Sequence, residues 1–314
     1  MSRCCLEVDD LTPHDVGTVL DHALEWKREP ASVPSLLEGS GAVGLFEKPS
    51  ARTRIAFELA VVGLGGHPMY VRGDEVGLGV RESPADVART FASYCSVLAA
   101  RVFDHDVLQV MADAVDRPVV NLLSDRAHPT QALADMLTLR EHFGVLEGRH
   151  LTFVGDGNNV AASLAFAAAL CGLEFTVASP PGYELDEDVA ERARNLGGAI
   201  EVTTDLHEAV RGTDALYTDV WTSMGQEDES AQRRQAFEGF TVDDALLALA
   251  SDDAVFLHCL PAHRGEEVSA SVIDGERSLV WKQAANRMHS LRALLALLLE
   301  STVTSNVPTT GEVP

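Results

Sequence analysis

Short apolar runs alternate with helical segments along most of this sequence, and this alternation limits the possible folds more than any other feature. In the first half, apolar runs as long as buried strands occupy residues 42–46, 69–72, 97–102 and 119–122. Segments of helical character lie between and before them, at residues 13–28, from about 50 onward, and at 84–94. Strands that alternate with helices build parallel sheets covered by helices. The pattern therefore predicts an α/β fold.

The same alternation begins again after residue 143 and predicts a second domain of the same class. Apolar runs recur at residues 151–154, 175–178, 200–203, 215–220 and 254–258, with helical segments at 160–171, 187–196 and 206–210. Residues 130–143 have apolar side chains at helical spacing, which predicts a helix joining the domains. We expect two doubly wound parallel-sheet domains, at residues 1–143 and 144–285, then a helix at 286–300 and a loose tail at 301–314.

The charge balance is strongly acidic. The sequence has 48 Asp and Glu against 24 Lys and Arg, a formal net charge of −24, and its lysines are Lys27, Lys48 and Lys282. This sign argues against nucleic acid and anionic membranes as partners. Scattered carboxylates with so little lysine suit a protein kept soluble in very high salt, where charge repulsion is screened, so we expect a halophilic source. The alternative is an acidic patch for a basic partner.

Cysteine usage and hydropathy bear on the compartment. The five cysteines, an odd number at irregular spacing, predict reduced thiols and neither a disulfide framework nor a zinc site. The longest apolar stretch, at residues 291–299, is far shorter than the ~20 residues that a membrane-spanning helix needs. The start of the sequence lacks the cationic segment and apolar core of a secretory signal. These observations predict a cytoplasmic protein without a membrane partner.

Residues 46–54, Phe-Glu-Lys-Pro-Ser-Ala-Arg-Thr-Arg, predict an anion site. They form a polar turn that opens a helix, and the first helical turn carries Arg52 and Arg54. A helix N-terminus offers unpaired backbone N–H groups and a partial positive charge, which together favour a bound phosphate. Ser50 and Thr53 add hydroxyl groups. The alternative is an ordinary basic start of a surface helix.

A glycine-containing loop at residues 155–159, Gly-Asp-Gly-Asn-Asn, follows a predicted strand as a dinucleotide-binding loop would. It lacks the third glycine, and Ala178-Ser179-Pro180 stands where an acidic residue would end the next strand. The loop therefore argues against nicotinamide binding. A helix start with paired asparagines suits the carboxylate of an amino acid instead.

Five motifs occur in an order typical of one protein family. They are Ser50-Ala51-Arg52-Thr53-Arg54, His128-Pro129-Thr130-Gln131, Gly155-Asp156-Gly157-Asn158-Asn159, Asp219-Val220-Trp221-Thr222-Ser223-Met224-Gly225 and His258-Cys259-Leu260-Pro261-Ala262-His263-Arg264-Gly265. From about residue 46 to 299 the sequence thus resembles the ornithine carbamoyltransferases. The first two motifs also occur in aspartate carbamoyltransferases, so the last two carry the choice of acceptor.

The resemblance implies that residues 1–143 form a carbamoyl-phosphate-binding domain, onto which the helix at 286–300 packs back. The phosphate contacts that it implies come from Ser50, the backbone N–H of Ala51, Arg52, Thr53 and Arg101. Arg101 and His128 would polarise the carbonyl oxygen, as donors preorganised for an oxyanion do. The carbamoyl amide would be held by Gln131, by the backbone carbonyls of Cys259 and Leu260, and by Arg287. Without Gln131 one helical turn later, His128 would be interpreted as a structural residue at the entry to a helix.

The resemblance also implies that residues 144–285 bind ornithine. Asp219 and Ser223 would fix the α-amine, Asn159 and the backbone of Met224 the carboxylate, and Cys259 would border the reacting amine. That amine resembles the lysine amine, with a pKa of about 10.4, so its deprotonation at pH 7 requires roughly 4.6 kcal/mol. The catalytic residues implied are Arg101, His128, Asp219 and Cys259. A nucleophilic Cys259 beside His258 is the alternative, although the resemblance implies no covalent intermediate.

Two departures from the family pattern concern phosphate binding. Ala51 stands where threonine is usual, and residues 77–82, Gly-Leu-Gly-Val-Arg-Glu, lack the glutamine that reaches the phosphate of a neighbouring subunit. Arg81 of a neighbour is a candidate substitute.

Taken together, the motifs predict a carbamoyltransferase that forms citrulline and phosphate from ornithine, or runs in reverse in arginine breakdown. The resemblance implies no metal or organic cofactor, and a homotrimer or trimer-based homo-oligomer. Putrescine is the alternative acceptor, aspartate a weaker one, and an inactive ligand-sensing relative the alternative outside enzymes.

Overall fold

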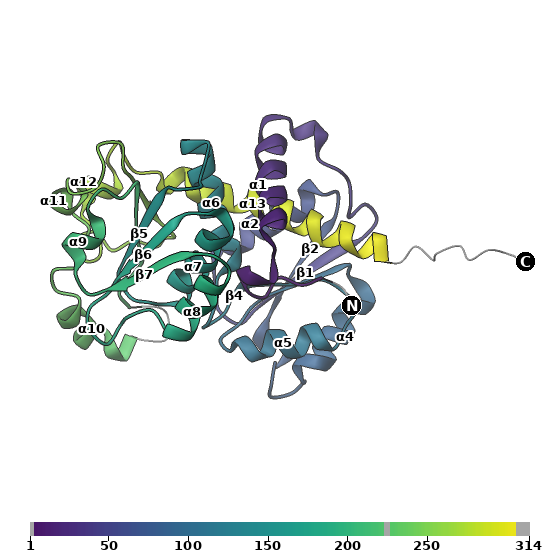
Figure 1. The fold of residues 1–314 in the computed structure, drawn as a ribbon. Coiled ribbons are helices and arrows are strands. Elements are labelled where there is room, and N and C mark those ends of the chain that lie inside the picture. Colours follow the sequence, from purple (N-terminus) through teal and green to yellow (C-terminus); the bar gives the residue numbers. More distant parts are fainter. Residues whose placement is uncertain (1–2, 223–226, 306–314) are drawn as a thin grey trace, which may run out of the picture.

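The computed structural model describes residues 3–222 and 227–305 and contains two parallel β-sheets in adjoining lobes (Figure 1). The first sheet has the order β2-β1-β3-β4, from strands β1 (Gly41–Phe46), β2 (His67–Arg72), β3 (Val97–Arg101) and β4 (Val119–Leu123). The second has the order β7-β6-β5-β8-β9, from β5 (His150–Val154), β6 (Glu174–Ala178), β7 (Ala199–Thr203), β8 (Ala215–Thr218) and β9 (Val255–His258). The prediction of two parallel-sheet α/β domains is confirmed.

Helices cover both faces of the first sheet because successive side chains of its buried strands point to opposite faces. Leu45 and Leu98 face α4 (Pro84–Tyr94) and α5 (His105–Asp113). Ala42 and Ala99 face the opposite layer, built from α1 (Pro13–Arg28), α2 (Ala51–Gly63) and α6 (Pro129–Phe143). The short α3 (Gly73–Val76) follows β2, and single 3₁₀ turns lie at Val8–Asp10 and Pro30–Ser32.

The second sheet is covered in the same manner. Phe153 belongs to the core shared with α7 (Asn159–Cys171) and α8 (Glu187–Asn195). Its neighbour Val154 belongs to the opposite core, with α9 (Leu206–Val210), α11 (Asp244–Leu247) and α12 (Ala270–Ile273). A 3₁₀ turn at Glu227–Glu229 leads into α10 (Ser230–Ala236). With both faces covered, the loops at the carboxyl ends of the strands are the place where a site can form.

The last helix, α13 (Val280–Ser305), ties the lobes together. It contacts β9 of the second lobe and α6, α2 and α1 of the first, and crosses from one lobe to the other in yellow in Figure 1. It begins at Val280, before the residue 286 predicted, because residues 280–285 contain no proline or glycine to stop it. None of the described helices is long and apolar enough to cross a membrane.

Some elements were not predicted. Helix α5 was missed, although Asp104 caps its first turn and Leu108 and Met111 face the core. The four-residue helices α3, α11 and α12 are too short to show a helical period in sequence. Strand β8 ends at Thr218, before the predicted residue 220, because the chain turns there toward a cavity.

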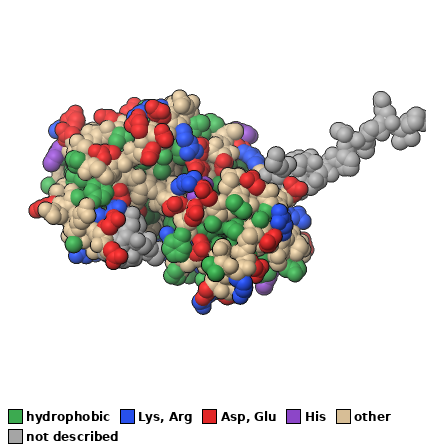
Figure 2. Space-filling model, turned by 90° about the horizontal axis from the view of Figure 1, so that it is seen from below, with side chains coloured by type: hydrophobic (Ala, Val, Ile, Leu, Met, Phe, Trp, Pro, Cys, Tyr) green, Lys and Arg blue, Asp and Glu red, His purple; other side chains and the backbone are tan. Residues whose placement is uncertain are grey.

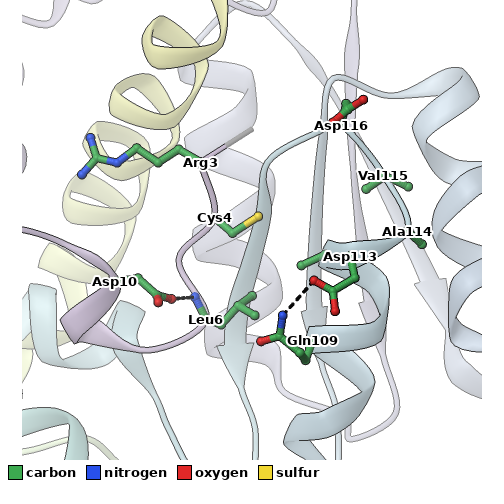
Figure 3. Close-up of a pocket in the computed structure, with 10 residues that line it drawn as sticks. Arg3, Cys4, Leu6, Asp10, Gln109, Asp113, Ala114, Val115 and Asp116 are labelled. Carbon is green, nitrogen blue, oxygen red and sulfur yellow. Dashed lines mark hydrogen bonds between the residues drawn. The ribbon is translucent and has the colours of Figure 1, made fainter. Parts of the chain in front are cut away.

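A small pocket of about 430 Å³ lies between the N-terminal segment and α5 (Figure 3). Two of its carboxylates accept hydrogen bonds within the protein: Asp10 accepts from the Leu6 N–H at 2.7 Å, and Asp113 accepts from Gln109 Nε2 at 3.0 Å. The pocket shares no lining residue with the large cavity described next.

Candidate active site

A cavity of about 1250 Å³ opens between the lobes at the carboxyl ends of both sheets. Loops after β1, β3 and β4 line it from the first lobe, and loops after β5, β8 and β9 from the second. The predicted site residues among its lining are Ser50, Ala51, Arg52, Thr53, Arg101, His128, Asn159, Asp219, Cys259, Leu260 and Arg287. The fold therefore brings together residues that lie up to 237 positions apart in sequence, from 50 to 287.

The start of α2 forms one wall of this cavity. Ser50 is the N-cap, and its Oγ accepts a hydrogen bond from the Thr53 N–H at 3.3 Å. The N–H groups of Ala51 and Arg52 precede the first intrahelical donor and have no intrahelical acceptor. Both residues line the cavity, so two backbone donors and the positive end of the helix are available to an anion there.

Three guanidinium groups surround this helix start. Arg52 donates to the Leu260 carbonyl at 2.9 Å, and Arg287 donates to Thr53 Oγ1 at 2.8 Å. Arg101 is only 5% exposed, and its Nε has no hydrogen-bond partner among the residues that the structure describes. Within the same residues, none of the three arginines forms a salt bridge. Uncompensated cations of this kind mark a site for a ligand with negative charge.

Burial and mutual repulsion change the acidity of this cluster. Desolvation, followed by the charges of Arg287 and Arg52, lowers the pKa of Arg101 to about 10. Desolvation also lowers the pKa of Arg287. Arginine side chains keep their proton in proteins, so both are cationic at neutral pH. The positive potential of the cavity therefore persists under the conditions in which an anionic substrate would bind.

His128 lies at the start of α6 and is 4% exposed. Its backbone N–H donates to Ser163 Oγ of the second lobe at 2.8 Å, which holds the residue against α7. Burial, then the charges of Arg287 and Arg101, places the pKa of His128 well below its usual 6.5. The imidazole is therefore neutral at pH 7 and carries one N–H, which suits a hydrogen bond to a carbonyl oxygen.

We expect His128 to stay neutral throughout the range in which an ordinary histidine titrates. Its pKa is lower in the native state than in the unfolded chain, so His128 favours the native state above about pH 6.5 and loses that effect as the pH falls toward its native pKa. An NMR titration of ¹³C-labelled imidazole resonances, assigned with His128→Gln, should show no inflection for His128 near 6.5. An inflection there would mean that the ring is solvated.

Gln131 is buried next to the residues that line the cavity. It lies one turn after His128, is 1% exposed, and donates from Nε2 to Asp135 at 2.8 Å. Its Oε1 is buried and has no hydrogen-bond partner in the described part of the chain. The buried side chain therefore has a hydrogen-bond acceptor, Oε1, that is unpaired within the described residues.

Asp219 and Cys259 form the polar centre of the second lobe's wall. Asp219 accepts from the Val220 N–H at 2.8 Å, from Asn158 Nδ2 at 3.0 Å and from the Cys259 thiol at 2.9 Å. Burial, reinforced by the charge of Asp219, raises the pKa of the Cys259 thiol well above its usual 9. The protonated thiol argues against the alternative of a nucleophilic cysteine, since the thiolate is the reactive form.

The two asparagines at the start of α7 have different hydrogen-bond partners. Asn158 caps α7, with Oδ1 accepting from the N–H groups of Val160 and Ala161. Asn159 donates to the Ser124 carbonyl of the first lobe at 2.6 Å and lines the cavity. Gly157 is required for chain packing, because a Cβ there would lie 2.3 Å from the Leu185 backbone nitrogen.

The loop after β9 is held by His258. Its Nδ1 accepts from the Leu260 N–H at 2.9 Å, so Nε2 carries the proton and donates to Glu267 at 3.2 Å. His258, Cys259 and Asp219 lie close enough together to hold a metal ion, as do His263, Glu266 and Glu267. In the first group the hydrogen bonds above already engage both imidazole nitrogens and the thiol.

Sequence reasoning missed an ion pair in the cavity wall. Arg233 on α10 donates to Asp156 at 2.6 Å and to the Trp221 carbonyl at 3.1 Å. Desolvation raises the pKa of Asp156, against the opposing effect of Arg233. No motif relates two residues this far apart, although Asp156 lies inside the glycine-containing loop. Two predicted ligand residues, Ser223 and Met224, lie outside the described residues.

Comparisons with known proteins cover nearly the whole chain. The model for the carbamoyl-P binding domain of aspartate/ornithine carbamoyltransferases matches residues 3–141, and the model for their Asp/Orn binding domain matches residues 147–298. An ornithine carbamoyltransferase of Acidothermus cellulolyticus is 50% identical over 314 residues, 98% of this chain and 100% of the relative.

Solved structures agree with this comparison. The ornithine carbamoyltransferase of Pyrococcus furiosus is similar with a TM-score of 0.91 at 43% identity, over 95% of this chain and 97% of that chain. The enzyme of Thermus thermophilus gives a TM-score of 0.86 at 45% identity, over 95% of this chain and 99% of that chain.

Proposed function

Since the chain belongs to the aspartate/ornithine carbamoyltransferase family, we propose that it transfers the carbamoyl group of carbamoyl phosphate to the δ-amine of L-ornithine, which gives L-citrulline and phosphate. One observation carries this function. Three arginines without acidic partners among the described residues surround a helix start, and the Asp219–Cys259 pair shares their cavity from the other lobe. An anion and an amine are the ligands that these two walls suit.

The reaction follows from the positions of these groups. Phosphate at the start of α2 is held by the N–H groups of Ala51 and Arg52, and Arg101 and neutral His128 stabilise the carbonyl oxygen as it becomes an oxyanion. The neutral δ-amine attacks the carbonyl carbon and forms the new C–N bond. The C–O bond to phosphate then breaks, and the departing phosphate takes up the proton that the nitrogen sheds.

The acceptor is selected by the second lobe. Asp219 is an acceptor with fixed donors, so an ammonium group beside it gains a charge-assisted hydrogen bond. A protonated thiol at Cys259 adds no second negative charge, which favours delivery of the reacting amine in its neutral form. Asn159 on the cavity wall remains the proposed contact for the substrate carboxylate.

An acceptor panel tests this function. Initial rates would be measured with carbamoyl phosphate and ornithine, putrescine or aspartate, in buffers with and without molar KCl. We expect turnover with ornithine and at least a hundredfold lower kcat/KM, about 2.7 kcal/mol, for both alternatives. A preference for putrescine would overturn the ornithine assignment, and a folded protein without turnover would overturn the proposed enzyme.

For the assembly we propose a homotrimer or a trimer-based homo-oligomer in the cytoplasm. Support comes from α2, whose outer face carries Ile55, Leu59 and Val62, each more than half exposed in the single chain. An apolar stripe at helical spacing favours burial in an interface. Light scattering should give a multiple of three times 33.7 kDa. A monomer at assay concentration would contradict this.

We further propose that the protein is adapted to high salt, as its charge predicts. Figure 2 shows carboxylates spread over the visible face and not gathered in one patch. With a net charge of −24, screening removes repulsion that opposes the native state. We expect the thermal midpoint to rise as KCl increases from 0.1 to 2 M, and to rise less in sucrose of matched osmolality without added salt. A midpoint that falls with KCl would contradict salt adaptation.

A further inference from the structure

A buried carboxylate lies behind the cavity wall, where the two lobes meet. Asp135 on α6 is 0% exposed and accepts three hydrogen bonds. The donors are Gln131 Nε2 at 2.8 Å, Gln283 Nε2 at 2.7 Å and the Tyr217 hydroxyl at 3.1 Å. They come from α6, α13 and β8, so one side chain joins elements of both lobes.

Through Gln283 this carboxylate reaches the end of β9. Gln283 donates from Nε2 to Asp135, and its Oε1 accepts from the His258 N–H at 2.9 Å. The next residue is Cys259, which lines the cavity and donates to Asp219. Because Gln283 uses both ends of its amide, its orientation is fixed by the presence of an acceptor at position 135.

Asp135 also fixes the polarity of Gln131. A carboxylate accepts hydrogen bonds, so the Gln131 amide must turn its NH₂ toward Asp135 and its oxygen away. That oxygen is buried and without a partner among the described residues, a state that is unfavourable unless a ligand supplies a donor. A carbamoyl NH₂ group is a donor of this kind.

Three donors surround Asp135 and favour its acceptor form. Burial has the largest effect on its pKa and raises it to about 7, although the hydrogen bonds from Gln131, Gln283 and Tyr217 lower the pKa. Oδ1 of Asp135 accepts from both glutamines and its Oδ2 from the Tyr217 hydroxyl. An amide at this position still offers one oxygen to both glutamines, whereas a leucine offers no acceptor. This hydrogen-bonded cluster extends to the end of β9 on one side and to the unpaired Gln131 Oε1 on the other. Stability alone would require neither of these connections to the cavity.

We propose that Asp135 is a positioning residue for carbamoyl recognition: it orients the Gln131 oxygen toward the carbamoyl NH₂ group and, through Gln283, holds the end of β9 in place. This inference rests on the proposed function, because the carbamoyl group is the ligand that it concerns.

The test compares two ligands that differ at one group. Phosphonoacetamide carries the amide NH₂ of the carbamoyl group, and acetonylphosphonate has a methyl group in its place. Titration calorimetry on the full chain should show the amide binding about tenfold or more tighter, as expected for a buried acceptor left unpaired by the methyl analogue. In Asp135→Leu, which has no acceptor for the Gln131 NH₂ group, the preference should vanish.

Kinetics and a conservative variant separate positioning from folding. We expect Asp135→Leu, which removes the acceptor, to lower kcat about 10²-fold, as misplaced reacting groups do, with the KM for ornithine within twofold. Asp135→Asn is the conservative variant, since its Oδ1 can accept from both glutamines while its Nδ2 donates to the Tyr217 hydroxyl. It should keep most of the parental kcat. Asp15→Leu, the same change at a buried carboxylate of the α1 capping box, is the matched control.

The results of these variants either support or overturn the proposed role of Asp135. Parental ligand preference and kcat in Asp135→Leu would overturn the proposal, as would an Asp135→Asn variant with the parental thermal midpoint but the kcat of Asp135→Leu. If Asp135→Leu does not fold, Gln283→Met removes the hydrogen bonds of Gln283 to His258, Asp135 and Tyr217 and leaves the acceptor of Gln131 in place. An unchanged kcat in that variant would overturn the proposal. A parent that prefers the amide analogue but does not use ornithine would contradict the acceptor assignment and leave this inference standing.

Discussion

Arg101→Ala is expected to lower kcat/KM for carbamoyl phosphate about 10²- to 10³-fold, equivalent to about 2.7–4 kcal/mol of transition-state stabilisation. Arg101 is buried at the end of β3, and its guanidinium Nε has no partner among the described residues. Its donors are therefore in place before the substrate arrives, and they need no reorganisation as the oxyanion forms. Most of the loss should appear in kcat.

A surface arginine provides the control for this change. Arg126→Ala removes the same charge from an exposed side chain that pairs with Asp106, and it should leave the kinetics unchanged. Arg101→Ala should also move the pKa of His128 upward, since Arg101 is one of the charges that lower it. A loss below tenfold in Arg101→Ala would mean that the carbonyl oxygen lies elsewhere.

The second large effect is expected at Asp219. Asp219→Asn can keep its oxygen toward the Val220 N–H and the Cys259 thiol, but its NH₂ group then faces the Asn158 NH₂ group, which now donates to the Asp219 Oδ2. The amide also cannot form a charge-assisted hydrogen bond with an ammonium group. We expect kcat/KM for ornithine to fall at least 10²-fold, because a buried charged partner is lost.

The two lobes should respond separately to this variant. Binding of phosphonoacetamide, measured by calorimetry, should stay within twofold of the parent in Asp219→Asn, because Asp219 is not among the residues proposed to contact the phosphonate or its amide. Asp113→Asn, an exposed carboxylate that only accepts from Gln109, is the matched control for the same chemical change. An equal loss of phosphonate binding and ornithine use would indicate a general collapse of the cavity.

The class of fold was accessible from sequence because both relevant signals are local. Buried parallel strands such as β1 and β5 are short apolar runs, and the helices between them carry their own period and caps. Ser50 shows this for the site, since its capping hydrogen bond and the arginines after it lie within one turn. The other ligand contacts were predicted from the resemblance of the five motifs, in their order, to the carbamoyltransferases.

What sequence could not reveal depends on contacts between distant segments. The bond from Gln283 to Asp135 spans 148 positions, and that from Arg233 to Asp156 spans 77. No local pattern distinguishes such residues from ordinary surface polar groups. Gln131 illustrates the limit, because its spacing from His128 was visible but the Asp135 carboxylate that sets its orientation was not.

The formation of a bond between the carbamoyl carbon and the ornithine δ-nitrogen is the most direct test. Carbamoyl phosphate labelled with ¹³C would be incubated with [δ-¹⁵N]ornithine and the protein, and followed by ¹³C NMR. The account predicts a carbamoyl carbon signal split by one-bond coupling to ¹⁵N, at a rate that Arg101→Ala and Asp219→Asn both suppress. An unsplit product signal, or coupling that appears only with α-¹⁵N label, would contradict it.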